Sequence, residues 1–171
     1  MEVLFSDIVG MRVVADEVQP LSTVKNLVID PENGKILAYV VDAFRNKIIC
    51  PIDVVEWKSA VLRVHDADAI IDGNEVMRVE KVQNDGIQIL GSKVETEEGM
   101  LLGRVYDYSV DNASESLKNL YVAKGLLILF RCEKKIISWQ NILEILPGRI
   151  VVKSGLVTIE EGAALREQGA A

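Results

Sequence analysis

Residues that could carry out chemistry are few and scattered in this sequence. His65 is the only histidine, and Asp66 and Asp68 follow it closely. Metal sites combine several ligands from separated positions, so a single histidine in a polar turn indicates a surface residue. One histidine and two cysteines with apolar neighbours also leave few options for a Ser-His-acid or Cys-His arrangement. We therefore expect a protein that is not an enzyme, with no catalytic or metal-binding residue and no cofactor.

Two other short motifs have structural explanations. Asp30-Pro31-Glu32-Asn33-Gly34 lacks the alternating ligands and the distal Glu of a calcium loop, and it is typical of a β-turn. The two cysteines, Cys50 and Cys132, are too few for a disulfide framework and are expected to be small buried residues.

The most unusual segment is the apolar run 126–130, because neighbouring side chains of a strand point to opposite faces. The outward face of this run is either covered by another part of the chain or exposed to solvent, and the sequence does not decide between these two possibilities. An exposed face would bind a partner or a second copy of the chain. The candidate partner-binding residues are Leu127, Leu129, Arg131, Lys134 and Lys135.

Composition limits the class of protein and of partner. Apolar residues make up 49% of the 171 residues, which is enough for a packed core, and Val, Ile and Leu favour strands. The net charge of −7 disfavours direct binding to RNA or anionic membranes. No apolar run reaches the roughly 20 residues of a membrane span, and the N-terminus lacks a secretion signal. A cytoplasmic location is expected.

An internal repeat organises the chain. Residues 10–41 align without a gap with residues 91–122, at an offset of 81; after an insertion, the offset becomes 88. Gly10 matches Gly91, and Ile48 matches Ile136. Each copy has short strands separated by turn signals. Only the tail, roughly residues 159–168, shows any helical tendency, and we leave open whether it is a short helix or disordered.

Side-chain parity changes within the second strand of each copy. Val24 and Val105 should face inward, and Leu27 and Tyr108 should do so as well. This spacing requires an extra residue, a β-bulge, near Asn26 and Asp107. Bulges bend strands strongly, which favours a closed or nearly closed barrel over a flat sheet.

The predicted fold is therefore all-β: two tandem small, highly bent β-barrels of about five or six strands each, with short helical turns. The predicted ranges are 1–74 for the first barrel, 75–85 for a linker, 86–154 for the second barrel and 155–171 for the tail. Trp57 and Trp139 occupy related places in the two copies, where packing is the expected role.

Four segments resemble the PRC-barrel family. They are Val9-Gly10-Met11-Arg12-Val13-Val14, Leu101-Leu102-Gly103-Arg104-Val105-Tyr106-Asp107, Ile29-Asp30-Pro31-Glu32-Asn33-Gly34-Lys35-Ile36 and Ile49-Cys50-Pro51-Ile52-Asp53-Val54. Ser22 replaces the family's Gly in the first copy, Trp139 replaces its Pro in the second, and one hairpin of the second copy is longer.

The resemblance implies two tandem barrels that act in assembly, as in the cytoplasmic part of the photosynthetic reaction-centre H subunit and the C-terminal domain of a ribosome maturation factor. It carries no catalytic residue. The expected function is a non-enzymatic adaptor that binds a protein of unknown identity, or itself, through its barrel surfaces. The alternative is an RNA-metabolism or ribosome-maturation-type factor that acts through the protein part of a ribonucleoprotein.

Overall fold

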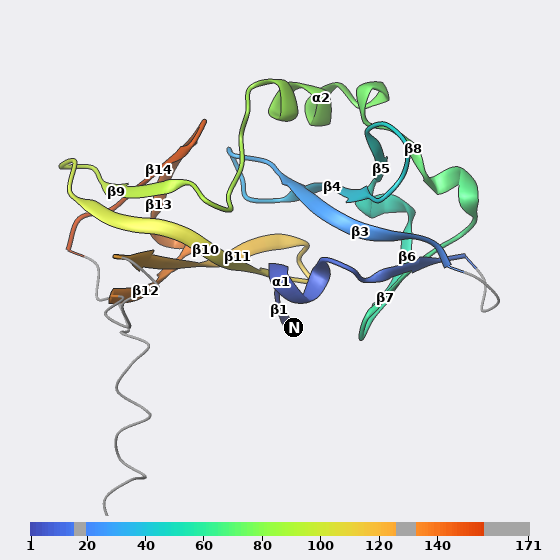
Figure 1. Ribbon diagram of the computed structural model, residues 1–171, viewed down its shortest axis with the longest axis horizontal. Helices are drawn as coiled ribbons and strands as arrows, with labels where there is room; N and C mark the ends of the chain where they lie inside the picture. Colours follow the sequence, from blue (N-terminus) through green and yellow to red (C-terminus); the bar gives the residue numbers. More distant parts are fainter. Residues whose placement is uncertain (16–19, 126–132, 156–171) are drawn as a thin grey trace, which may run out of the picture.

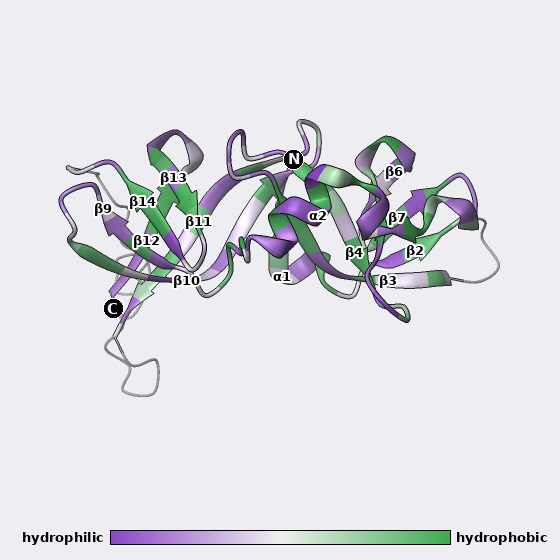
Figure 2. Ribbon diagram, turned by 90° about the horizontal axis from the view of Figure 1, so that it is seen from above, coloured by the Kyte–Doolittle hydropathy of each residue, from purple (hydrophilic) through white to green (hydrophobic). Residues whose placement is uncertain are grey.

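The computed structural model describes residues 1–15, 20–125 and 133–155. It contains two curled β-sheets that lie side by side along the long axis of the molecule (Figures 1 and 2). Strands dominate, so the predicted all-β class with a barrel-like fold is confirmed. None of the helices in the described segments has the length and apolarity that a bilayer crossing requires.

The first sheet has seven strands in the spatial order β6-β7-β2-β3-β4-β5-β8. Strands β2 and β7 are parallel, and the other neighbours are antiparallel. The strands are β2 (Arg12–Val14), β3 (Pro20–Ile29), β4 (Ile36–Val41), β5 (Lys47–Ile49), β6 (Val54–Lys58), β7 (Val61–Val64) and β8 (Ile71–Asp72).

The second sheet repeats this order, because its path β13-β14-β9-β10-β11-β12 corresponds strand by strand to β6-β7-β2-β3-β4-β5. Strands β9 and β14 are again the parallel pair. Its seventh strand, β1, pairs with β10. The strands are β1 (Glu2–Leu4), β9 (Lys93–Thr96), β10 (Leu101–Asp111), β11 (Ser116–Lys124), β12 (Glu133–Ser138), β13 (Ile142–Leu146) and β14 (Arg149–Val152).

The predicted bulges are confirmed in both copies. The register shifts between Val24 and Asn26 in β3 and between Val105 and Asp107 in β10. The register skips Lys25 in β3 and Tyr106 in β10. Directly after each skipped residue, a side-chain oxygen accepts the next backbone N–H: Asn26 accepts from Leu27 at 2.9 Å, and Asp107 accepts from Tyr108 at 2.8 Å. This bond replaces part of the disrupted ladder.

A helix lies where the sequence analysis placed only a linker. Helix α2 (Met77–Asn84) covers the outer face of the first sheet, and its buried Val79 and Val82 pack in a cluster with Val28 and Ile48. Gly86 ends it with a positive φ of 70°. The N–H of Gly86 donates to the carbonyl oxygen of Gln83, and the N–H of Ile87 donates to that of Val82. This pair of hydrogen bonds is a Schellman motif.

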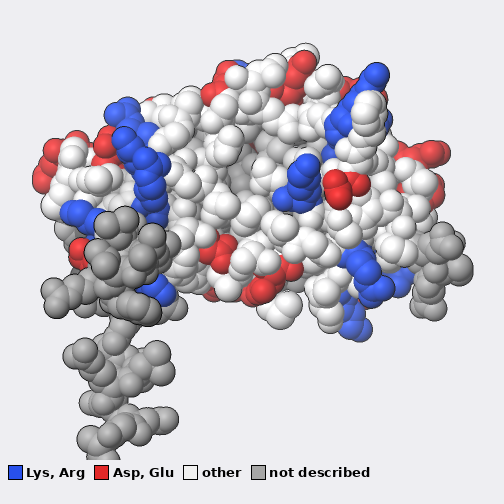
Figure 3. Space-filling view, in the orientation of Figure 1, with Lys and Arg blue, Asp and Glu red and all other residues white. Residues whose placement is uncertain are grey.

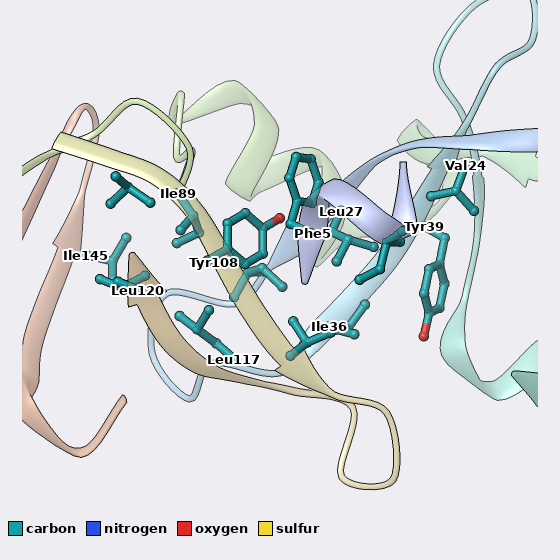
Figure 4. Close-up of a cluster of buried hydrophobic side chains, with 14 of the residues drawn as sticks. Phe5, Val24, Leu27, Ile36, Tyr39, Ile89, Tyr108, Leu117, Leu120 and Ile145 are labelled. Carbon is teal, nitrogen blue, oxygen red and sulfur yellow. The ribbon is translucent and has the colours of Figure 1, made fainter. Parts of the chain in front are cut away.

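The sheets share one core. Helix α1 (Phe5–Ile8) inserts Phe5 between β3 and β10, and its ring stacks on Tyr108 with centroids 4.6 Å apart (Figure 4). Residues from both sheets, such as Leu27 and Leu120, belong to this single buried cluster. The chain begins in β1 of the second sheet before it enters the first, so residues 2–4 do not lie with the rest of the predicted first barrel.

The contact between the sheets is reciprocal. The N–H of Ile36 donates to Glu115 O and the N–H of Leu117 donates to Gly34 O, both at 2.8 Å. The two bonds are equivalent under the repeat, because Leu117 is the counterpart of Ile36 and Glu115 is the counterpart of Gly34 at the offset of 81. Lys35 bridges Ser116, its own counterpart 81 residues later. A residue that meets its own counterpart in an antiparallel bridge indicates a local two-fold relation.

Candidate protein-interaction groove

A groove of about 600 Å³ lies between the two sheets. We call it the inter-sheet groove; it is lined by the bulge of β3, residues 43–46 after β4, residues 87–90, and Phe5 and Val9 beside α1. The space-filling view shows the surface hollowed between the halves, with basic side chains at one side (Figure 3).

The charge of the inter-sheet groove is positive. Its charged lining residues are Lys25 and Arg45, and no described Asp or Glu lines it. Both are exposed, and neither forms an ion pair with another described residue. In a chain with a net charge of −7, two such cations over an apolar floor favour an anionic, partly apolar ligand.

The loop that carries Arg45 is held in place. Arg45 has a φ of 70°, a left-handed conformation that costs a non-glycine residue roughly 1–2 kcal/mol. The adjacent Asn46 exchanges two amide hydrogen bonds with Gln83 of α2, at 2.7 and 3.1 Å. The O atom of Asn46 also accepts the N–H of Gly73 at 2.8 Å. These bonds fix the loop and so limit the entropy that Arg45 loses on binding.

Helix α2, which anchors this loop, is itself tied to the sheet by a buried carboxylate. Arg78 donates two hydrogen bonds to Asp30, at 3.2 and 2.7 Å, and also contacts Glu32 at 2.9 Å. Burial alone would raise the pKa of Asp30, but the bonds from Arg78 and the Glu32 N–H outweigh it and lower the pKa. Asp30 therefore remains a carboxylate down to a more acidic pH than usual.

The counterpart of this groove on the second sheet is acidic. It is lined by Glu2, Leu4, Asp7, Tyr106, Asp107, Tyr121 and Lys134. The last four match Lys25, Asn26, Val40 and Asn46 of the inter-sheet groove. The hydrogen bond from Ser109 lowers the pKa of Glu2; burial opposes this shift, and Asn119 and Lys118 add to it.

The partner-binding residues predicted from the sequence fall in two places. Leu127, Leu129 and Arg131 lie outside the described residues, so the question of the 126–130 run stays open. Lys134 and Lys135 lie on β12, where adjacent side chains face opposite sides. Lys134 lies 5.5 Å from the ring centroid of Tyr106.

Lys135, by contrast, shares the side of the core residue Ile137 and contacts Glu133 at 2.6 Å. The structure therefore does not bring the two lysines together on one surface. The sequence analysis also missed Lys25 and Arg45, although Lys25 lies directly before a predicted bulge.

Other residues singled out in the sequence have ordinary surroundings. His65 is exposed after β7, and Asp66 accepts the N–H of Asp68 at 2.9 Å. Cys50 is a half-buried free cysteine, and burial raises the pKa of its thiol. Cys132 lies outside the described residues. Trp57 packs edge-on against Tyr39, with ring centroids 5.7 Å apart.

Comparison with known families gives one match, which covers less than half of the chain. Residues 1–78 match the PRC-barrel domain. No curated protein matches the chain. PRC-barrel domains are protein-interaction or assembly modules and are generally non-catalytic.

Proposed function

We propose that the chain is a non-enzymatic assembly module of two tandem PRC-barrel-type units. Three observations support the second unit: the matching strand order, the bulges 81 residues apart and the reciprocal bonds between the sheets. The shared core joins the units rigidly, so that a groove between them keeps its shape.

The inter-sheet groove binds an acidic, partly apolar segment of a partner protein. The observation that carries this function is the pair of cations, Lys25 and Arg45, over an apolar floor to which the described residues contribute no carboxylate. A carboxylate of the partner would meet both cations, while the partner's apolar side chains would contact Phe5 and Val40. The kind of domain favours a protein over a small molecule as the occupant.

A photo-crosslinking amino acid at Val9, in the full chain, tests this function in extract of the source cell. The expected result is one captured protein, crosslinked through an acidic segment and unaffected by nuclease. The double variant Lys25→Glu/Arg45→Glu should weaken capture at least about tenfold, because like charges across an interface cost several kcal/mol. Lys58→Glu changes an equally exposed lysine on β6 and should leave capture unchanged.

Two results would contradict the proposal. Capture that disappears after nuclease treatment would favour the alternative, an RNA-metabolism factor. Equal capture by the groove variants and by Lys58→Glu would show that the inter-sheet groove is not the binding site. Self-association and a cytoplasmic location remain predictions from the sequence.

A further inference from the structure

Three basic side chains form a row across the second sheet, which we call the basic row. Arg149 of β14 lies opposite Lys93 of β9, and Lys93 lies opposite Arg104 of β10. Residues opposite each other in a sheet share a face, and all three side chains are exposed. Neighbouring strands are roughly 4.8 Å apart, so three positive charges lie close together. Figure 3 shows basic side chains gathered in a column on the half of the molecule that the second sheet forms.

The protein neutralises only one end of the basic row. Arg149 forms an ion pair with Glu95 at 3.1 Å. Lys93 and Arg104 form no ion pair with another described residue, and Arg104 donates a hydrogen bond to the carbonyl oxygen of Gly91 at 2.8 Å. Like charges directly opposite each other across antiparallel strands destabilise a sheet. An anion bound between Lys93 and Arg104 would remove this repulsion.

The equivalent row of the first sheet is not basic. The second row continues onto Ala123 of β11, which lies opposite Arg104. The four positions of the first row are held by Val61, Arg12, Thr23 and Asp42, which correspond to Arg149, Lys93, Arg104 and Ala123. The first row therefore has one cation and one acid, whereas the second has three cations and no acid in the same places. Since the two sheets have the same strand order, the fold does not require the extra cations.

A pocket of about 350 Å³ opens beside the basic row. Lys93 and Arg104 line it together with apolar groups of β10 and β11, among them Leu101, Val105 and Ala123. Leu101 is 45% exposed although it is a large apolar residue. Among the described residues, no Asp or Glu lines this pocket. Its volume suits a small molecule, since ligand pockets usually measure about 300–1,000 Å³.

We propose that this pocket binds a small amphipathic phosphate, that is, a phosphate monoester on an apolar body. The phosphate lies between Lys93 and Arg104, where its oxygens accept charge-assisted hydrogen bonds from both cations. The apolar body lies against Leu101 and Val105. A phosphate dianion fits better than a carboxylate, because it neutralises both cations at once. The proposal does not depend on the function of the inter-sheet groove, which is lined by other residues.

Titration calorimetry of the full chain with naphthyl phosphate tests this site. At about pH 8 the probe carries nearly two negative charges, because the second pKa of a phosphate monoester is about 6, and we expect one saturable site. Lys93→Gln and Arg104→Gln should each weaken binding at least roughly tenfold, the loss expected for one hydrogen bond between charged groups. The matched control is Arg12→Gln, which changes the exposed counterpart of Lys93 on the first sheet and should leave binding unchanged.

Naphthol and inorganic phosphate separate the two parts of the probe, and both should bind at least roughly tenfold more weakly than naphthyl phosphate. Equal binding of either one overturns the proposal, because it would show that the site does not recognise both charge and apolar surface. Absence of binding by the probe, or an equal loss in Arg12→Gln, does the same. Lys25→Glu/Arg45→Glu should retain binding, and a loss in this variant would place the probe in the inter-sheet groove instead. Retention on phosphatidate vesicles without binding of the soluble probe would also overturn the proposal, in favour of a membrane surface.

A second measurement needs no ligand. Lys93→Gln removes a like charge opposite Arg104, so it should raise the midpoint of thermal unfolding at low salt. The rise should fade in about 1 M salt, where the Debye length is only about 3 Å. A lower midpoint would show that Lys93 stabilises the fold, and it would contradict the repulsion from which the anion site is inferred.

Discussion

Replacing Phe5 by Ala tests whether the two sheets unfold together. Phe5 is 8% exposed and stacks on Tyr108 of the second sheet, while its helix also touches β3 of the first. Truncation of a buried Phe to Ala costs about 3–5 kcal/mol. This is a large part of the roughly 5–15 kcal/mol that stabilises an ordinary domain. The loss should lower the stability of both sheets by the same amount, because they share one core.

The two tryptophans make the assay specific to each sheet. Trp57 lies on β6 of the first sheet, and Trp139 precedes β13 of the second. Urea unfolding of Trp57→Phe and Trp139→Phe variants, followed by the fluorescence of the remaining tryptophan, should give coincident transitions before and after Phe5→Ala. Phe44→Ala is the control, because Phe44 is 86% exposed, and it should change stability by no more than about 0.5 kcal/mol.

Two separate transitions would refute the reasoning. A Phe5→Ala effect confined to the Trp139 signal would do the same, because it would show that the sheets are independent. In either case the two sheets that line the inter-sheet groove would not be held together by one core, and the proposed function depends on that.

Two further substitutions follow from local geometry. Gly103 has a φ of 142°, and a Cβ there would overlap the backbone carbonyl of Ala123 on β11. Gly103→Ala should therefore destabilise the chain by roughly 2–5 kcal/mol in urea, from backbone strain and overpacking together. Gly99→Ala is the control, because Gly99 also has a positive φ (84°) but a Cβ there would meet no other atom. It should lower the stability by only about 1–2 kcal/mol, from backbone strain alone. Equal losses of stability in the two variants would contradict the overlap at Gly103. The lowered pKa of Asp30 means that its ion pair stabilises the fold above the unfolded-state value near pH 4. That contribution disappears as the pH falls through the lower folded pKa, so Asp30→Asn should flatten the acid limb of the stability curve; an unchanged acid limb would contradict the ion-pair argument.

The bulges could be predicted because the same change in apolar spacing occurs in both halves of the sequence. In one copy, the apolar spacing of Val24 and Leu27 could be an accident. The same change of parity at Val105 and Tyr108 leaves a bulge as the common solution. Burial forces such a solution, since a strand without the bulge would turn an entire apolar set toward water.

Helix α2 was missed because it is short and follows a strand-rich segment. Its apolar residues Val79 and Val82 have helical spacing, but eight residues give little periodicity. The stronger signal was Gly86, since a glycine directly after such a run ends many helices. The pairing of β1 with β10 had no local signal, because three residues cannot indicate which of two similar sheets they join.

The candidate site was harder to predict than the fold, because it depends on contacts between the copies. Lys25 and Arg45 are 20 residues apart in sequence, and the groove that joins them is completed by residues 87–90 of the other copy. Of the five partner-binding residues predicted from the sequence, only Lys134 and Lys135 lie within the described residues, and they face opposite sides of β12 because they are consecutive in a strand. The predicted surface as a whole stays a prediction.

The charge difference between the two grooves supports the proposal that the inter-sheet groove binds an acidic partner. The reciprocal bonds from Ile36 to Glu115 and from Leu117 to Gly34 relate the two sheets by a local two-fold, and four lining residues of one groove correspond to four of the other. Lys25 corresponds to Tyr106, and the acidic groove gains Glu2 and Asp7 from the N-terminal segment. Counting only residues whose placement the structure describes, one groove is lined by two cations and no carboxylate, and the other by three carboxylates and one lysine. A partner that recognises charge can distinguish the two grooves, and the acidic groove would repel the segment that we propose for the inter-sheet groove.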